Sequence, residues 1–132
     1  MNYLLDTCAL IYLDTHPQSI SDKVLKKLDE ADEIYVSAVT SWEISIKSSL
    51  KNKERQIKLG VPVKDFFANC FNKYGLKYLP IEFHHPYKVA ELPWIHSDPF
   101  DRLLISIALD KDLVIVSSDK SIPKYESVKV LW

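Results

Sequence analysis

The sequence predicts an α/β protein in which a central, mainly parallel sheet is covered by helices on both faces. Short apolar segments suited to strands alternate along the chain with longer segments whose apolar residues recur at helical spacing. Several strand segments are continuously apolar, a pattern typical of strands buried on both faces of a parallel sheet. No repeat, linker or low-complexity segment interrupts this alternation, so residues 1–132 are predicted to form a single domain.

The first half of the chain supplies two predicted strands. Segment 3–5 is short and apolar, and segment 34–36 repeats that pattern after an acidic turn. A helix before the second strand has an apolar stripe that includes Val24 and Leu28, and a serine can cap it. Three helical segments are predicted in this half of the chain. They are a helical turn over 9–13, the helix capped by Ser19 or Ser21, and a helix over 39–50.

The second half continues the alternation and is punctuated by proline and glycine. Pro62 marks the start of a helix that Gly75 ends, and a short helix is predicted over 84–92. Pro80 places the strand predicted at 76–81 at an edge or a strand end. The remaining predicted strands are the apolar segment 113–116 and the last strand, 128–131.

Segment 97–109 is predicted to start a buried helix that carries two acids at its entrance. Asp98 suits the N-cap, because its side-chain oxygen can accept from the free N–H groups of the first turn. Pro99 follows at the first helical position, where its missing N–H costs nothing. Capping therefore accounts for Asp98, whereas Asp101 at the third helical position has no such role and is expected to have a partner.

Composition and charge exclude several classes of protein. A hydrophobic content of 47% is ordinary for a soluble globular chain, and a net charge of −1 argues against a protein that coats nucleic acid without specificity. With two glycines, no glycine-rich loop can hold a nucleotide phosphate. Cys8 and Cys70 are expected to be reduced thiols, and the lack of a signal sequence or membrane span predicts a cytoplasmic protein.

Four acids follow predicted strands or begin the helices beyond them. Asp6 comes directly after the first strand, and Asp119 lies three residues beyond the strand that ends at Val116. Glu43 and Asp101 lie in the first turns of helices. Functional groups of an open parallel sheet gather beyond the carboxyl ends of its strands, so the four side chains can converge there. Carboxylates placed together repel one another unless a cation neutralises them, and such hard oxygen ligands suit Mg²⁺ or Mn²⁺.

Each acid also has a structural interpretation of its own. Asp6 can serve as a helix cap. Glu43 can pair with Lys47 four residues on, and Asp119 can be an ordinary turn residue. The combination of the four acids therefore carries more weight than any one of them.

Basic residues follow Glu43 along the predicted helix and into the loop after it. Between residues 47 and 58, five basic residues stand against one acid, a local balance of +4. Positions four and eight residues after Glu43 share roughly its helical face, so the segment can form a positive track for the phosphates of a substrate. A solvated helix end is the alternative, since lysine suits the negative end of the helix dipole. The candidate substrate-binding residues are Lys47, Lys51, Lys53 and Arg55.

Four segments of the chain resemble the PIN domain family, and within it the VapC-type toxins of bacterial toxin–antitoxin pairs. They are Leu-Leu-Asp-Thr at 4–7, Ser-Trp-Glu-Ile-Ser-Ile-Lys at 41–47, His-Ser-Asp-Pro-Phe-Asp-Arg-Leu-Leu-Ile at 96–105 and Ser-Ser-Asp at 117–119. The resemblance spans nearly the whole chain and implies a Rossmann-like three-layer α/β/α fold. It also implies an endoribonuclease dependent on Mg²⁺ or Mn²⁺, with RNA as substrate, a cognate antitoxin as partner, and a homodimer.

The resemblance also assigns roles to residues by their position in these motifs. Thr7 and Ser117 match polar positions beside the metal, and Asp98 belongs to the motif of the subgroup. Asp6 and Asp101 are expected to be the main metal ligands, while the other acids act directly, through water, or by orienting the nucleophile. No catalytic histidine is required, because a carboxylate-held cation lowers the pKa of bound water. The predicted catalytic and metal-binding residues are Asp6, Glu43, Asp101 and Asp119.

Two other functions are alternatives. A catalytically silent PIN-fold module would bind RNA or protein without cleaving it, and RNA cleavage that EDTA abolishes separates the two. A phosphoaspartyl phosphatase with Asp6 as nucleophile would need an acid two residues later, where this chain has Cys8. The four histidines lack metal-ligand spacing, and His96 alone is a candidate for contact with substrate.

Overall fold

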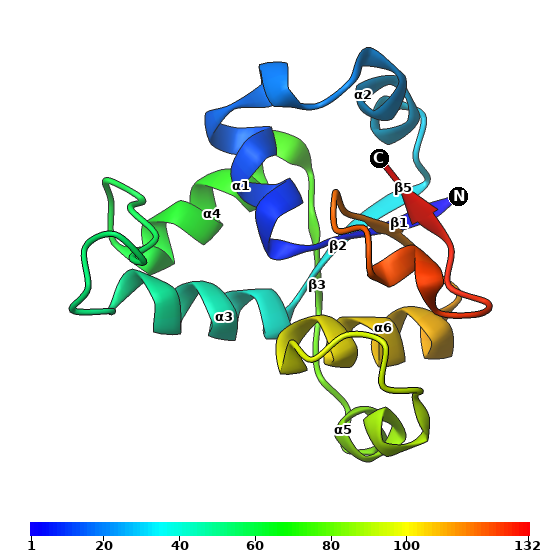
Figure 1. The fold of residues 1–132 in the computed structure, drawn as a ribbon. Coiled ribbons are helices and arrows are strands. Elements are labelled where there is room, and N and C mark those ends of the chain that lie inside the picture. Colours follow the sequence, from blue (N-terminus) through cyan, green and yellow to red (C-terminus); the bar gives the residue numbers. More distant parts are fainter.

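The computed structural model describes residues 1–132, and its sheet consists of five strands (Figure 1). They are β1 (Asn2–Leu5), β2 (Glu33–Ser37), β3 (Lys77–Leu79), β4 (Val114–Val116) and β5 (Val130–Leu131). All neighbouring strands pair in parallel, in the order β3-β2-β1-β4-β5. β1 is central, with its Leu4 beside Tyr35 of β2 and Ile115 of β4. The predicted parallel sheet is confirmed.

Helices cover both faces of this sheet. They are α1 (Thr7–Thr15), α2 (Asp22–Asp29), α3 (Ala38–Ser48), α4 (Val63–Tyr74), α5 (His84–Lys88) and α6 (Pro99–Lys111), with 3-10 turns at Pro17–Ser19, Val89–Glu91 and Ile122–Lys124. Side chains of α1, α2 and α4 pack with Leu5 on one face, and those of α6 pack with Leu4 on the other (Figure 1). The predicted three-layer α/β/α fold is therefore confirmed. None of these helices combines the length and the apolar composition needed to cross a membrane.

Several elements begin or end at residues other than those predicted. α1 begins at Thr7, two residues earlier than predicted, because Asp6 caps it directly after β1. The third strand shortens to Lys77–Leu79, since only these residues pair with β2. α3 ends early because the hydroxyls of Ser48 and Ser49 bind backbone carbonyls of the preceding turn and compete with helical hydrogen bonds.

Caps at the helix ends follow the sequence closely. Ser21, one of the two candidate serines, accepts from the N–H of Val24 and caps α2. Asp98 caps α6, with its Oδ1 atom 2.8 Å from the N–H nitrogen of Phe100. Gly75 has a φ of +61° directly after α4, a left-handed conformation that glycine adopts without strain. The capping interpretation of Asp98 is therefore confirmed.

The carboxyl ends of the central strands bring three helix starts to one edge of the sheet. β1 leads directly into α1, and β2 leads directly into α3. The start of α6 lies near these two helix starts, as Figure 1 shows. This edge is therefore where side chains from distant parts of the sequence can meet.

Candidate active site at the carboxyl edge of the sheet

Asp6 is both a helix cap and a buried acid. Its backbone N–H donates to the carbonyl of Val116 at 3.2 Å, which extends the β1–β4 pairing by one residue. Its Oδ1 atom accepts from the N–H of Ala9 at 2.7 Å, and the residue is 5% exposed. Because one carboxylate oxygen is sufficient for the cap, the second remains available for other contacts.

Glu43 lies on the buried side of α3 and is held by two partners. The hydroxyl of Thr7 donates to Oε1, and the ammonium of Lys47 pairs with Oε2. The predicted pairing of Glu43 with Lys47 is therefore present, but Glu43 is 4% exposed and is not a solvated surface residue. Burial alone would lower the pKa of Lys47, but the hydrogen bond and charge of Glu43 outweigh it and raise that pKa.

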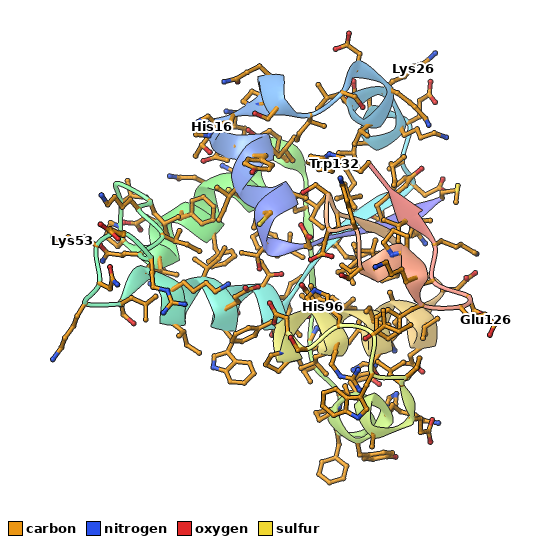
Figure 2. All side chains as sticks on the ribbon, viewed as in Figure 1. His16, Lys26, Lys53, His96, Glu126 and Trp132 are labelled. Atoms are coloured by element: carbon orange, nitrogen blue, oxygen red, sulfur yellow. The ribbon has the colours of Figure 1, made fainter.

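Asp101 and Asp119 meet at His96, whose ring lies near the start of α6 (Figure 2). Nε2 of His96 lies 2.9 Å from Oδ2 of Asp101 and 3.0 Å from Oδ2 of Asp119. On its other side, Asp119 accepts from the N–H of Ser121 at 2.7 Å, and its own N–H donates to the hydroxyl of Ser117. Burial alone would raise the pKa of Asp119, but the hydrogen bonds from Ser121 and His96 outweigh it and lower that pKa.

The other two aspartates have raised pKa values because they are buried among acids. Burial, together with the charges of Glu43 and Asp119, raises the pKa of Asp6 to about 6, although hydrogen bonds from Ser117 and Ala9 partly offset this increase. Burial, together with the charges of Asp98, Asp6 and Glu43, raises the pKa of Asp101 to about 7. The structure thus brings the four predicted acids into one electrostatic environment. We call this group, Asp6, Glu43, Asp101 and Asp119, the acidic cluster.

His96 belongs to the sequence motif at 96–105, but the motif does not indicate which residues it contacts. The sequence suggested only that His96 contacts substrate. In the structure its backbone N–H donates to the hydroxyl of Tyr125 at 2.9 Å, and its Nδ1 accepts from the N–H of Asp98 at 3.3 Å. Because Nδ1 is an acceptor, the proton of the neutral ring is on Nε2, which points at Asp101 and Asp119.

Arg102 is a second residue of the site that the sequence reasoning missed. Its guanidinium is buried without a carboxylate partner and donates to the carbonyls of Pro93, Val89 and Leu92 at 2.8 to 3.3 Å. It also lies over the ring of Trp94, 4.3 Å from the centroid. These hydrogen bonds from the buried guanidinium of Arg102 fix the segment that leads to His96. Arg102 therefore positions the loop that carries His96 to the acidic cluster.

The predicted basic track divides into two parts. Because α3 ends at Ser48, Lys51 does not lie on its helical face, and that part of the prediction is wrong. Lys47 and Arg55 line a cavity beside Glu43, whereas Lys51 and Lys53 do not. Lys53 lies at the outer end of the loop, away from the acidic cluster (Figure 2).

Comparison with known families and curated proteins gives one match. The profile of the PIN domain family matches residues 3–128, nearly the whole chain. Among curated proteins, none matches the sequence. The family assignment therefore depends on the profile match.

Solved structures share the fold at low sequence identity. VapBC2 from Rickettsia felis, solved bound to a DNA fragment from their promoter, has a TM-score of 0.71 and 16% identity, over 99% of this chain and 98% of that one. VapBC from Salmonella typhimurium, solved bound to DNA, has a TM-score of 0.66 and 17% identity, over 99% and 97%. VapBC-5 from Mycobacterium tuberculosis, described as a member of the VapBC family of toxin-antitoxin systems, has a TM-score of 0.56 and 12% identity, over 98% and 95%.

Proposed function

The chain belongs to the PIN domain family, and from this premise we propose that it is a divalent-metal-dependent endoribonuclease, the toxin of a toxin–antitoxin pair. The observation that carries the proposal is the buried carboxylate of Asp6 and the half-buried carboxylate of Asp101, which lie among other acids and whose pKa values are raised to about 6 and about 7. A fold that crowds ionisable acids in this way loses stability unless a cation joins them. The arrangement therefore favours a working site that includes a bound cation.

The atoms offered at the acidic cluster suit a hard divalent ion. Asp6 and Asp101 contribute carboxylate oxygens, with Glu43 and Asp119 beside them, and Mg²⁺ and Mn²⁺ prefer such oxygen ligands. The second oxygen of Asp6, which the helix cap leaves available, is one such ligand atom. Once bound, the ion supplies a water of lowered pKa and stabilises negative charge on the phosphate oxygens.

The residues around the acids fix where this chemistry takes place. Thr7 and Lys47 hold the two oxygens of Glu43, so that its carboxylate is oriented before substrate arrives. The Nε2–H of His96 holds Asp119 close to the start of α6. Preorganised carboxylates of this kind lose little conformational freedom when they act, which favours catalysis.

Cleavage of single-stranded RNA tests the nuclease proposal. The purified chain is expected to cut RNA internally with Mg²⁺ or Mn²⁺, to stop when EDTA is added, and to resume when metal is restored in excess. Sequencing the new RNA ends would identify the target. RNA binding without cleavage in either metal would contradict the nuclease and favour a catalytically silent binding module.

The partner part of the proposal is a small cognate antitoxin and a homodimer of the toxin. It is supported by likeness to proteins solved as VapBC assemblies. An arginine or lysine from such an antitoxin would suit the acidic cluster, because guanidinium and ammonium groups bind carboxylates. Expression of the chain alone is expected to arrest growth, and light scattering is expected to give a dimer. A non-toxic monomer at high yield would contradict both.

A further inference from the structure

A cavity of about 610 Å³ lies beside the acidic cluster, between α1, α3 and the loop that follows α3. Ile11, Leu50 and Ile57 provide its apolar side. Thr7 and Glu43 line it as well, so the cavity borders the acidic cluster at Glu43. A ligand that occupies this cavity therefore lies beside this edge of the acidic cluster.

Two basic side chains line the same cavity, and only one of them is already paired. Lys47 forms its ion pair with Glu43. Arg55 is exposed and lies within 4 Å of no carboxylate, so its guanidinium retains all its donors. A free guanidinium at the rim of an apolar cavity can bind a phosphate through two parallel hydrogen bonds.

The loop that carries Arg55 is fixed to the end of α3. The N–H of Ile57 donates to the carbonyl of Lys47 at 3.0 Å, and the side-chain amide of Gln56 donates to the carbonyl of Ser48 at 2.8 Å. Inside the loop, the N–H of Arg55 donates to the carbonyl of Asn52 at 3.2 Å. The backbone of Arg55 is therefore placed at the cavity before any ligand binds.

We propose that this cavity is a nucleotide subsite, which receives an unstacked base of single-stranded RNA while Arg55 binds an adjacent phosphate. The inference rests on the proposed RNA cleavage, because it places a neighbouring nucleotide of the same substrate. An apolar cavity of this size suits a small ring system, and single-stranded RNA offers bases that can leave the stack. The border at Glu43 puts the base beside the acidic cluster, where the proposed cut takes place.

The charge of the cavity favours RNA over a partner protein as the occupant. Its only free charge is the guanidinium of Arg55, which complements the phosphate that accompanies every base. Lys53 offers a matched comparison, because it has the same charge, lies on the same loop and is absent from the cavity. A subsite predicts that these two residues differ, whereas a general positive surface predicts that they do not.

Cys8 allows occupancy of the cavity to be measured without cleavage. Its thiol lines the cavity and is exposed, whereas Cys70 is buried, so a thiol reagent labels one position in the folded chain. The full chain would be labelled with N-ethylmaleimide at pH 8 in EDTA, with and without a random single-stranded RNA octamer, and analysed by mass spectrometry.

The RNA octamer is expected to slow labelling of Cys8 at least fivefold, and Arg55→Ala is expected to lose most of this protection while Lys53→Ala keeps it. Polyphosphate, which has charge but no bases, is expected to protect far less. Equal protection by polyphosphate, or octamer binding detected by fluorescence anisotropy without protection, would overturn the subsite, and the second result would favour a protein occupant. Absence of octamer binding would overturn the subsite as well.

Cleavage kinetics then separate failure of the subsite from failure of the nuclease. Arg55→Ala is expected to raise KM about tenfold and to reduce the salt slope of binding by about 0.7, the value for one lost single-strand phosphate contact. Its kcat should be nearly unchanged, and Lys53→Ala should match the wild type in all three quantities. Cleavage with an unaffected KM in Arg55→Ala would overturn the subsite alone. Protection of Cys8 without cleavage in any metal would overturn the nuclease alone.

Discussion

Two clusters of titratable side chains lie near opposite ends of α6, and they satisfy their charges in different ways. The acidic cluster uses Asp101 at the start of the helix, and the second cluster uses Asp110, about 13 Å further along the helix axis. We call the second group the histidine cluster. Its members are Glu82, His84, His85 and Asp110.

The side chains of the histidine cluster are satisfied by hydrogen bonds within the cluster and to the neighbouring Lys111. The N–H of Glu82 donates to Nδ1 of His85 at 2.9 Å, which leaves Nε2–H of His85 to donate to Asp110 at 2.8 Å. His84 lies 3.1 Å from the same carboxylate oxygen, and Lys111 donates to Glu82 at 2.9 Å. The hydrogen bonds from the two histidines lower the pKa of Asp110, and the hydrogen bond from Lys111 lowers that of Glu82.

The two clusters therefore shift the pKa of their acids in opposite directions. Asp110 has donors in place and ionises readily, whereas Asp6 and Asp101 face other acids and resist ionisation. Four potential metal ligands within reach of one another do not by themselves make a metal site. In the histidine cluster, the Nε2–H of His85 donates to Asp110, and the ammonium of Lys111 lies beside both Glu82 and Asp110. In the acidic cluster Lys47 pairs with Glu43, but Asp6 and Asp101 keep raised pKa values, which is why the proposed cation is placed there.

Asp101→Asn is expected to give the largest effect, because Asp101 lies among other acids and its pKa is raised to about 7. Cleavage should fall by about 10³-fold, equivalent to about 4 kcal/mol. The increase in Tm that Mg²⁺ or Mn²⁺ gives the wild type should shrink, and the metal-free variant should melt at a higher temperature because a disfavoured charge is gone. Asp112→Asn, at the exposed opposite end of α6, is the matched control. Thermal melts would contradict Asp101 as a ligand if the metal response stayed unchanged.

His85→Ala is expected to affect stability alone, since the histidine cluster is structural. The side chain is fully buried and joins α5 to α6, so its removal should lower the free energy of unfolding by about 2–4 kcal/mol. Urea titration measures this loss, and kcat per folded molecule should be unchanged. Lys111→Gln, which removes an exposed partner, should change the unfolding free energy little. Loss of cleavage in His85→Ala without loss of stability would give this cluster a functional role.

The smallest expected effect is a pH dependence of the metal-free protein. The folded pKa values of Asp6 and Asp101, about 6 and about 7, lie above their ordinary 3.8, so the folded state binds more protons between pH 4 and 7. Stability should therefore fall as pH rises through this window, and Tm in EDTA should decrease with it. Calorimetry with Mg²⁺ or Mn²⁺ should show most of the loss restored at pH 7 and little change at pH 4. A Tm in EDTA that rises steadily from pH 4 to 7 would contradict the raised pKa values.

The fold and the helix caps could be predicted because they depend on residues close together in the sequence. Asp98 and Asp101 follow from the spacing of one helix start, and the parallel sheet follows from short apolar segments. Asp6 illustrates the limit of this reasoning, since capping and membership of the acidic cluster looked like alternatives. One oxygen serves the cap, so the structure combines both.

The contacts that sequence could not predict join residues brought together by loops. His96 and Asp119 are separated by 23 residues, and their contact depends on a loop held by the buried guanidinium of Arg102. The error at Lys51 has a local cause, because serine hydroxyls end α3 at Ser48 and send the chain around a loop. A prediction from helical periodicity extends the helix by residue spacing alone, so it does not detect a helix end of this kind.

The central position of β1 in the sheet has a consequence for the time at which the acidic cluster is assembled. During synthesis Asp6 emerges first, and β1 can pair with β2 as soon as residue 37 is available. The other neighbour of β1 is β4, and Asp119 follows it, more than a hundred residues after Asp6. A nascent chain on the ribosome, itself made largely of RNA, therefore carries an incomplete acidic cluster through most of translation. The order of the strands therefore delays assembly of the acidic cluster until the chain is nearly finished.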